Sequence, residues 1–167
     1  LTYLTARGNW YYASWKGDLA KSGGIAANIG VHFFDMLLWI FGDVKSSTVH
    51  RNAHDRAAGY LELDRARVKW FLSIDADILP KSVTDTGART YRALTIEDEN
   101  FEFSGGFTEL HDKSYAGILA GDGFGLDAVR PAIDLVHTIR HAELTGLGGN
   151  HHPLAEVVGK KHPFSKG

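Results

Sequence analysis

The chain has 167 residues, of which 44% are hydrophobic and 23% charged, with no cysteine and a formal net charge of -2. This length and composition suit a single globular domain with its own hydrophobic core, and they exclude a disordered chain. The charge balance argues against a basic nucleic-acid groove, and the absence of cysteine excludes disulfides, thiolate metal sites and a cysteine nucleophile.

The first 42 residues contain a strand, an arm and a helix. Residues 1–6 have strand composition, and residues 6–18, ARGNWYYASWKGD, continue as an irregular aromatic arm. From Ile25 to Ile40, apolar residues recur every three or four positions, which predicts a helix with one buried face that begins after Gly23-Gly24 and ends at Gly42.

Polar residues interrupt this apolar helix at His32 and Asp35, before the ~18 apolar residues that a membrane span needs. We therefore expect no membrane partner. The cytoplasm is the default location.

The middle of the chain is rich in β-branched and aromatic residues. Residues 45–52, 57–76 and 89–105 predict four or five antiparallel strands joined by hairpins, with residues 77–88 as a long hairpin loop. One strand carries large side chains on both faces, Trp70 on one and Phe71 on the other. A sheet face of that kind suggests packing against another subunit or domain.

Two further helices are predicted near the end of the chain. The first covers residues 108–121 with Thr108 as its N-cap. The second covers residues 126–144, where Pro131 must lie near the first turn or kink the helix. Its apolar stripe is Leu126, Val129, Ile133, Val136 and Ile139. The fold class is therefore α+β, an open and mainly antiparallel sheet with helices on one face. Residues 1–150 form the domain, and residues 151–167 form a loosely wrapped tail.

Three polar residues share one side of the helix after Gly24. Asn28 and His32 are four residues apart, and Asp35 follows three later. One interpretation is the edge of an active site, in which the histidine exchanges a proton and the amide orients a substrate hydroxyl. The other is a core histidine with its hydrogen bonds satisfied, and an aspartate bonded to a nearby amide. A zinc site is the third and weakest interpretation, because asparagine is a poor zinc ligand.

The arm concentrates cationic, hydroxyl and aromatic side chains. Arg7, Tyr11, Ser14 and Lys16 can hold a carboxylate or phosphate while the flat rings stack on a ring-bearing ligand. The alternative is an amphipathic strand with its aromatic residues in the core and its charges in water.

The stretch SGGIAANIGVHFFDMLLWIFG resembles the signature that opens the C-terminal domain of the glucose-fructose oxidoreductase/inositol dehydrogenase (Gfo/Idh/MocA) family. The matching residues are Gly23, Gly24, Gly30, His32, Asp35, Trp39 and Gly42. The segments RGNWYYASWKGD, GYLELDRARVKWFLSI, FSGGFTELHDKSYAGILAG and GFGLDAVRPAIDLV look like one branch, the UDP-N-acetyl-2-amino-2-deoxy-glucuronate dehydrogenases of bacterial O-antigen (lipopolysaccharide) biosynthesis.

The resemblance implies the substrate and oligomerisation domain of a two-domain oxidoreductase, whose Rossmann domain would bind NAD, supply a catalytic lysine and lie outside this chain. The implied reaction oxidises the C3 hydroxyl of UDP-N-acetylglucosaminuronate to the 3-keto sugar. His32 would lie beside that hydroxyl, and Asp35 would be structural. Asn28 departs from the aspartate of many relatives, so it would orient the sugar without accepting a proton.

The same resemblance makes Arg7, Tyr11, Ser14 and Lys16 the expected substrate contacts, and a homo-oligomer the expected assembly. It implies no metal. Two other functions stay open, a dehydrogenase of a free sugar or inositol and a non-catalytic sugar-binding or scaffolding domain. Without the NAD-binding domain, we expect this chain to be inactive.

Overall fold

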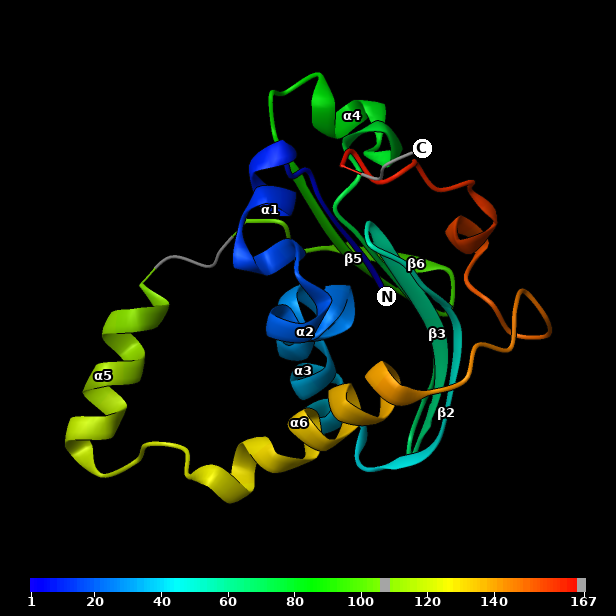
Figure 1. The fold of residues 1–167 in the computed structure, drawn as a ribbon. Coiled ribbons are helices and arrows are strands. Elements are labelled where there is room, and N and C mark those ends of the chain that lie inside the picture. Colours follow the sequence, from blue (N-terminus) through cyan, green and yellow to red (C-terminus); the bar gives the residue numbers. More distant parts are fainter. Residues whose placement is uncertain (106–108, 165–167) are drawn as a thin grey trace.

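Within residues 1–105 and 109–164, which the computed structural model describes, six strands form one sheet with the order β2-β3-β4-β1-β5-β6 (Figure 1). The strands are β1 (Thr2–Thr5), β2 (Val44–Asn52), β3 (Arg56–Leu63), β4 (Arg67–Ser73), β5 (Thr90–Ile96) and β6 (Glu99–Glu102). The predicted antiparallel hairpins are confirmed for β2–β3, β3–β4 and β5–β6.

The first strand occupies the centre of the sheet. β1 pairs parallel to β4, with Thr2 opposite Phe71, and antiparallel to β5. Because β1 lies between β4 and β5, these two strands are not neighbours. The predicted hairpin over residues 77–88 is therefore wrong. That connection holds two short helical turns, η3 (Ala76–Ile78) and α4 (Lys81–Thr84).

The arm folds into three short helical turns. They are α1 (Asn9–Ala13), η1 (Trp15–Gly17) and α2 (Leu19–Ser22). The Asp18 carboxylate caps α2 by accepting a hydrogen bond from the amide of Ala20 at 2.9 Å. The interpretation of this segment as an amphipathic strand is wrong.

The central helix follows at once, as the π-helical segment η2 (Ala26–Gly30) and then α3 (Val31–Phe41). It ends at Gly42 as predicted, where the backbone has φ 88°. By length and composition alone, Leu19–Phe41 would also pass as a membrane span. The polar residues in this helix therefore do not exclude a span by themselves, contrary to our expectation. Its apolar face lies on the sheet, with the rings of Phe34 and Trp70 edge to face at 5.2 Å.

Helices cover one face of the sheet, as predicted. α2, α3 and α6 (Leu126–His141) lie together on that face in Figure 1. Only the second half of the apolar stripe of α6 is buried. Val136 and Ile139 are buried, whereas Leu126, Val129 and Ile133 are exposed, and Pro131 falls in the second turn.

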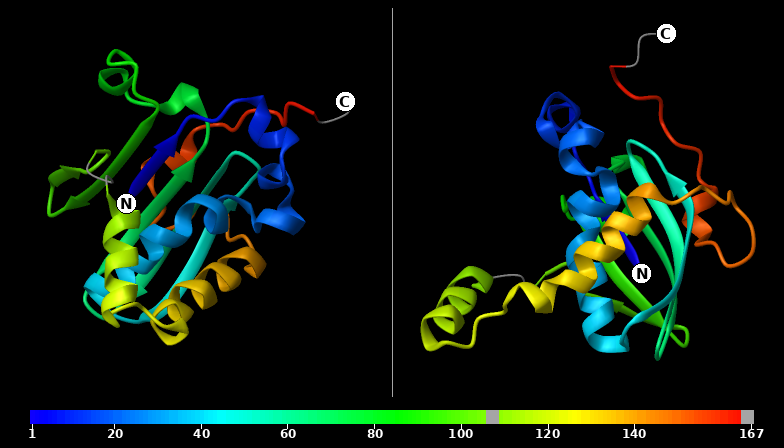
Figure 2. Two further views of the ribbon diagram at one scale, coloured as in Figure 1. Left: turned by 90° about the vertical axis from the view of Figure 1, so that its left-hand side faces the viewer. Right: turned by 60° about the horizontal axis from the view of Figure 1, so that its bottom comes forward.

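The tail covers part of the opposite face of the sheet. It contains η4 (Pro153–Glu156), which Figures 1 and 2 show across the sheet from α6. Ala155 is fully buried against Leu4, Ala58 and Phe71, and the ring of His152 stacks on Phe71 at 5.6 Å. The expectation of a loosely wrapped tail is therefore wrong. Phe71, which suggested a partner subunit, is buried by its own chain.

The helix predicted over residues 108–121 stands apart from the sheet and the other helices. α5 (Leu110–Ala120) projects from the sheet and the other helices in Figure 1 and in the right-hand view of Figure 2. The predicted N-cap, Thr108, lies outside the described residues.

Candidate active site

The outer face of the helix over residues 24–41 carries the predicted catalytic residues. Gly23 and Gly24 have left-handed backbone, with φ 76° and 83°, which ends α2 and lets a new helix begin. The face packed on the sheet carries Phe33, Phe34 and Leu37. The opposite face, by helical periodicity, carries Asn28, His32, Asp35 and Trp39.

Asn28 and His32 lie one helical turn apart, Asn28 in the π-helical segment η2 and His32 in α3. Asn28 is half-buried in the π-helical segment η2, and π-turns are frequent at functional sites. No sequence pattern predicts the π-turn, whose Gly30 packs closely against the sheet residue Leu72.

His32 is exposed, and none of the described residues bonds or pairs with it. The interpretation as a core histidine is therefore wrong. Asp35 is exposed as well, and in the described part of the chain it has no hydrogen bond that would give it a structural role. Nor do those residues include a group of three histidine or acidic side chains suited to a metal ion.

The four predicted substrate contacts in the arm form two pairs, the cations Arg7 and Lys16 and the hydroxyl-bearing Tyr11 and Ser14. The cations Arg7 and Lys16 each lie 5.8 Å from the Trp10 ring, and Lys16 lies 5.8 Å from the Trp15 ring. Ser14 holds the arm together. Its hydroxyl donates to the carbonyl of Tyr11 at 2.8 Å and accepts from the amide of Lys16 at 3.3 Å.

Tyr11 is the inner member of the other pair, and only 1% of it is exposed. Its hydroxyl is buried without a hydrogen-bond partner in the described structure. Burial raises its pKa, and the charge of Arg7 opposes that rise in part. Tyr11 therefore anchors the arm in the core.

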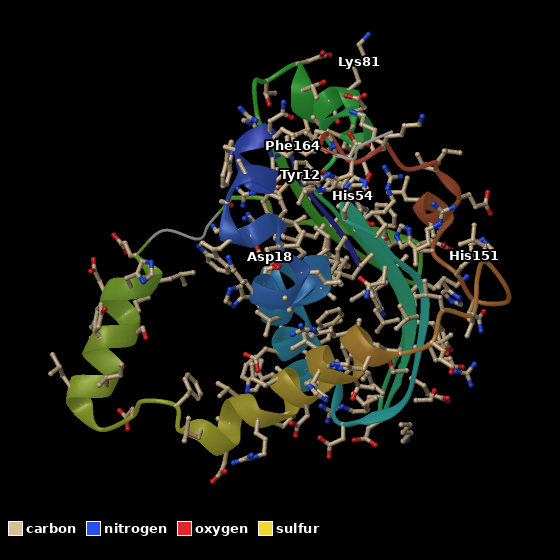
Figure 3. All side chains as sticks on the ribbon, viewed as in Figure 1. Tyr12, Asp18, His54, Lys81, His151 and Phe164 are labelled. Atoms are coloured by element: carbon tan, nitrogen blue, oxygen red, sulfur yellow. The ribbon has the colours of Figure 1, made fainter. Side chains whose placement is uncertain are left out.

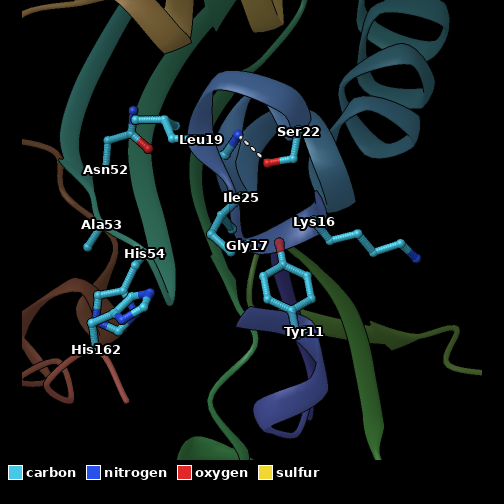
Figure 4. A pocket seen from close by; sticks show the side chains of 11 residues that line it. Tyr11, Lys16, Gly17, Leu19, Ser22, Ile25, Asn52, Ala53, His54 and His162 are labelled. Carbon is cyan, nitrogen blue, oxygen red and sulfur yellow. Dashed lines mark hydrogen bonds between the residues drawn. The ribbon is translucent and has the colours of Figure 1, made fainter. Parts of the chain in front are cut away.

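A small pocket lies between the arm, the β2–β3 turn and the tail, with a volume of about 160 Å³ (Figure 4). Its polar lining residues are Tyr11, Lys16, Ser22, Asn52, His54 and His162. Figure 4 shows the amino group of Lys16 pointing away from it. His32, Asn28, Arg7 and Ser14 do not line this pocket, so it does not bring the predicted site residues together.

Beside this pocket lies an ion cluster that the sequence reasoning missed. Arg56 is fully buried, and its guanidinium bonds Asp55 at 2.8 Å and Asp75 at 3.0 Å. From the tail, the amino group of Lys160 lies 2.8 Å from Asp75 and 2.6 Å from Asp77. The one available signal was the position of these charges, Arg56 at the start of β3 and Asp75 two residues after the end of β4.

His54, which lies near Tyr12 in Figure 3, connects the tail to the arm. His54 donates through Nε2 to the carbonyl of Lys160 at 2.9 Å and accepts through Nδ1 from the Tyr12 hydroxyl at 3.2 Å. Burial, followed by the charges of Asp55 and Asp75, raises the pKa of Tyr12 to about 12. Tyr12 therefore stays neutral and can donate this hydrogen bond at physiological pH.

The described residues do not form a site for a dinucleotide cofactor. The pocket beside the arm is much smaller than ligand pockets, which are typically ~300–1,000 Å³. No glycine-rich turn leads from a buried parallel strand into a helix in the described ranges. A cofactor that reacts next to His32 must therefore be held by residues other than these.

The chain is similar to solved structures of one enzyme. It is 50% identical to the WlbA (WbpB) dehydrogenase from Thermus thermophilus in complex with NAD and alpha-ketoglutarate, with a TM-score of 0.87. It is 48% identical to the same dehydrogenase in complex with NAD and UDP-GlcNAcA, with a TM-score of 0.86. Each match covers 92% of this chain and 50% of the other, so the chain spans about half of that protein's length.

Residues 2–89, just over half of the chain, match the family model described as the oxidoreductase family, C-terminal alpha/beta domain. That match contains the strand β1, the arm and the helix with His32. The chain therefore belongs to the Gfo/Idh/MocA oxidoreductase family, of which it contains the C-terminal α/β domain.

Proposed function

We propose that this chain is the substrate domain of a cytoplasmic NAD-dependent dehydrogenase that oxidises the C3 hydroxyl of UDP-N-acetylglucosaminuronate, as a step in bacterial O-antigen biosynthesis. One observation carries the proposal. His32 lies exposed and unbonded to other described residues, in a chain that is 48% identical to a dehydrogenase in complex with NAD and UDP-GlcNAcA.

The chemistry of this chain centres on His32. Its imidazole accepts the proton of the C3 hydroxyl as the C3–O bond becomes a carbonyl. Asn28 donates or accepts a hydrogen bond but takes no proton, so it orients the sugar. NAD, when bound, supplies the acceptor for the hydride that leaves C3.

The outer end of the arm suits the anionic part of such a substrate. Arg7 and Lys16 surround the exposed ring of Trp10, which places two cations and a flat surface together. Because Tyr11 is buried and the Ser14 hydroxyl is engaged in a cap, we assign the carboxylate or diphosphate contacts to Arg7 and Lys16. Tyr11 and Ser14 keep the arm in place.

The proposed assembly is a homo-oligomer. The sheet face that suggested it is partly covered by the tail, so the contact would use the part that stays open, such as the exposed Lys69 of β4. Light scattering of the full-length protein measures the assembly directly, and a monomeric mass would refute it.

The test is NADH absorbance with the full-length protein, NAD and four substrates: UDP-N-acetylglucosaminuronate, UDP-N-acetylglucosamine, myo-inositol and glucose. We expect NADH with the uronate alone. If all four are silent, the assay is repeated with 2-oxoglutarate to reoxidise tightly held NADH, and the 3-keto product is measured. NADH from the free sugars would favour the other dehydrogenase, and continued silence would favour a binding domain.

A further inference from the structure

The arm that carries Arg7 and Lys16 is bonded to the rest of the molecule at its base and at its middle. At the base, the amide of Arg7 donates to the carbonyl of Ile74 at 3.0 Å. At the middle, the Tyr12 hydroxyl donates to Nδ1 of His54 at 3.2 Å, and the two rings lie 5.5 Å apart. The positions of both cations therefore depend on what holds Ile74 and His54 in place.

The middle contact depends on Lys160 of the tail. Its carbonyl accepts a hydrogen bond from Nε2 of His54 at 2.9 Å. Because a carbonyl can only accept, this bond places the proton of a neutral His54 on Nε2 and leaves Nδ1 to accept from Tyr12. From the same tail, the His162 ring lies 4.9 Å from the Tyr12 ring and 5.0 Å from the His54 ring, and Figure 4 shows the two histidines side by side. The tail therefore fixes both the tautomer of His54 and the place of Tyr12.

The amino group of Lys160 holds the tail at the base of the arm. It lies 2.8 Å from Asp75, which follows Ile74 in the chain and is only 7% exposed. The same carboxylate bonds the fully buried Arg56 at 3.0 Å. A buried carboxylate that binds two cations is a firm attachment, because charge-assisted hydrogen bonds are roughly twice as strong as neutral ones. One residue of the tail therefore reaches both points that hold the arm.

We propose that Lys160 is a positioning residue for the substrate. Acting through His54 and Tyr12, it keeps the arm where its two cations meet the anionic part of the sugar nucleotide. This rests on the proposed function, in which Arg7 and Lys16 bind the carboxylate or diphosphate. Cations that are already held in place lose less conformational entropy when the substrate binds, so the tail raises affinity without taking part in the reaction.

The test compares Lys160→Met, Tyr12→Phe and the double variant in the full-length protein. The first removes the charge that holds the tail, and the second removes the hydrogen bond to His54 while the ring stays. We expect each to raise KM for UDP-N-acetylglucosaminuronate roughly 5-fold and to leave kcat within about twofold of wild type, because only preorganised binding is lost. The double variant should resemble the stronger single variant, since both changes break the same connection.

Lys161→Met is the matched control, because Lys161 is exposed and forms no ion pair with the residues that the structure describes. Lys160→Arg keeps the charge and should restore a KM close to that of the wild type. An unchanged KM in both single variants, a loss in kcat instead of KM, or effects that multiply in the double variant would overturn the proposal.

A second measurement needs no sugar. Hydrogen exchange of the full-length protein follows the amides of Tyr11, Ser14 and Gly17, which donate hydrogen bonds within the arm. If opening of the arm breaks its connection to the tail, Lys160→Met and Tyr12→Phe should each speed this exchange roughly 5-fold, and Lys161→Met should not. Unchanged exchange in an active enzyme would refute the role of Lys160 alone. Faster exchange in an enzyme that does not oxidise the uronate would refute the proposed reaction and leave the tail–arm connection standing.

Discussion

At the scale of single residues, the proposed chemistry depends on His32. Its side chain is exposed on the face of the helix that points away from the sheet, so replacing it removes no packing. We expect His32→Ala in the full-length enzyme to lower kcat by roughly 100-fold or more, the effect of removing a general acid or base. NADH formation measures it, with His137→Ala, another exposed histidine, as the control. A near-wild-type rate would refute the role given to His32.

His152 should make stability depend on pH. It stacks on Phe71, and burial lowers its pKa from 6.5 to about 4. The unfolded chain therefore binds more protons than the folded chain between these values, so the free energy of unfolding falls as pH drops from about 6.5 to 4. The full loss is on the order of 3–4 kcal/mol, since the two pKa values differ by about 2.5 units and each unit is worth ~1.4 kcal/mol.

Urea unfolding at several pH values tests this prediction, with His152→Gln as the non-titrating variant and the exposed His137→Gln as the control. The free energy of unfolding of His152→Gln should vary less between pH 7 and 4.5 than that of the wild type. Parallel curves for all three proteins would contradict it.

At the scale of elements, Gly30 sets how closely the central helix approaches the sheet. A Cβ at this position would lie 2.6 Å from Cδ1 of Leu72 and 2.9 Å from a ring carbon of Phe34. We expect Gly30→Ala to lower the free energy of unfolding by roughly 1–3 kcal/mol, because overpacking outweighs the helix preference of alanine. Gly117→Ala, with nothing within 4 Å, is the control. Equal effects in chemical denaturation would refute this packing argument.

The tail is held to the sheet by Lys160. Burial tends to raise the pKa of Asp75, but the hydrogen bonds from Lys160 and the Asp77 amide, together with the charges of Lys160 and Arg56, lower it overall. A lowered pKa in the folded state gives stability that is present above the unfolded pKa, ~4, and is lost as pH falls through the folded value.

We therefore expect Lys160→Met to lower the free energy of unfolding by about 1 kcal/mol at pH 7, as for a half-exposed ion pair. The difference from wild type should shrink below about pH 4, as Asp75 becomes protonated. Denaturant titrations at pH 7 and pH 3 check it. A deficit that is equally large at both values would mean that the lysine acts through packing alone.

At the scale of the whole molecule, the proposed proton acceptor and anion contacts lie in this chain, whereas the described residues form no pocket of dinucleotide size. We expect the 167-residue chain alone to give no NADH with any of the four substrates. Circular dichroism confirms that the sample is folded, and the full-length protein is the positive control. Turnover by the isolated chain would contradict both this expectation and the assignment of NAD to another domain.

Several features followed from the sequence by itself. The helix from Ile25 to Gly42, its outer face with His32, and the hairpins from β2 to β4 rest on signals carried by neighbouring residues. Helical spacing, alternation and cap glycines act over a few positions, so a local pattern is enough to predict them.

Other features were decided only by tertiary structure. The insertion of β1 between β4 and β5, the burial of Phe71 by the tail and the cluster around Arg56 join residues far apart in the chain. The apolar stripe of α6 looked uniform, yet only its second half reaches the core. The packing of the whole chain determines which strands pair, which apolar residues are buried and which charges meet. The spacing of neighbouring residues does not predict these contacts.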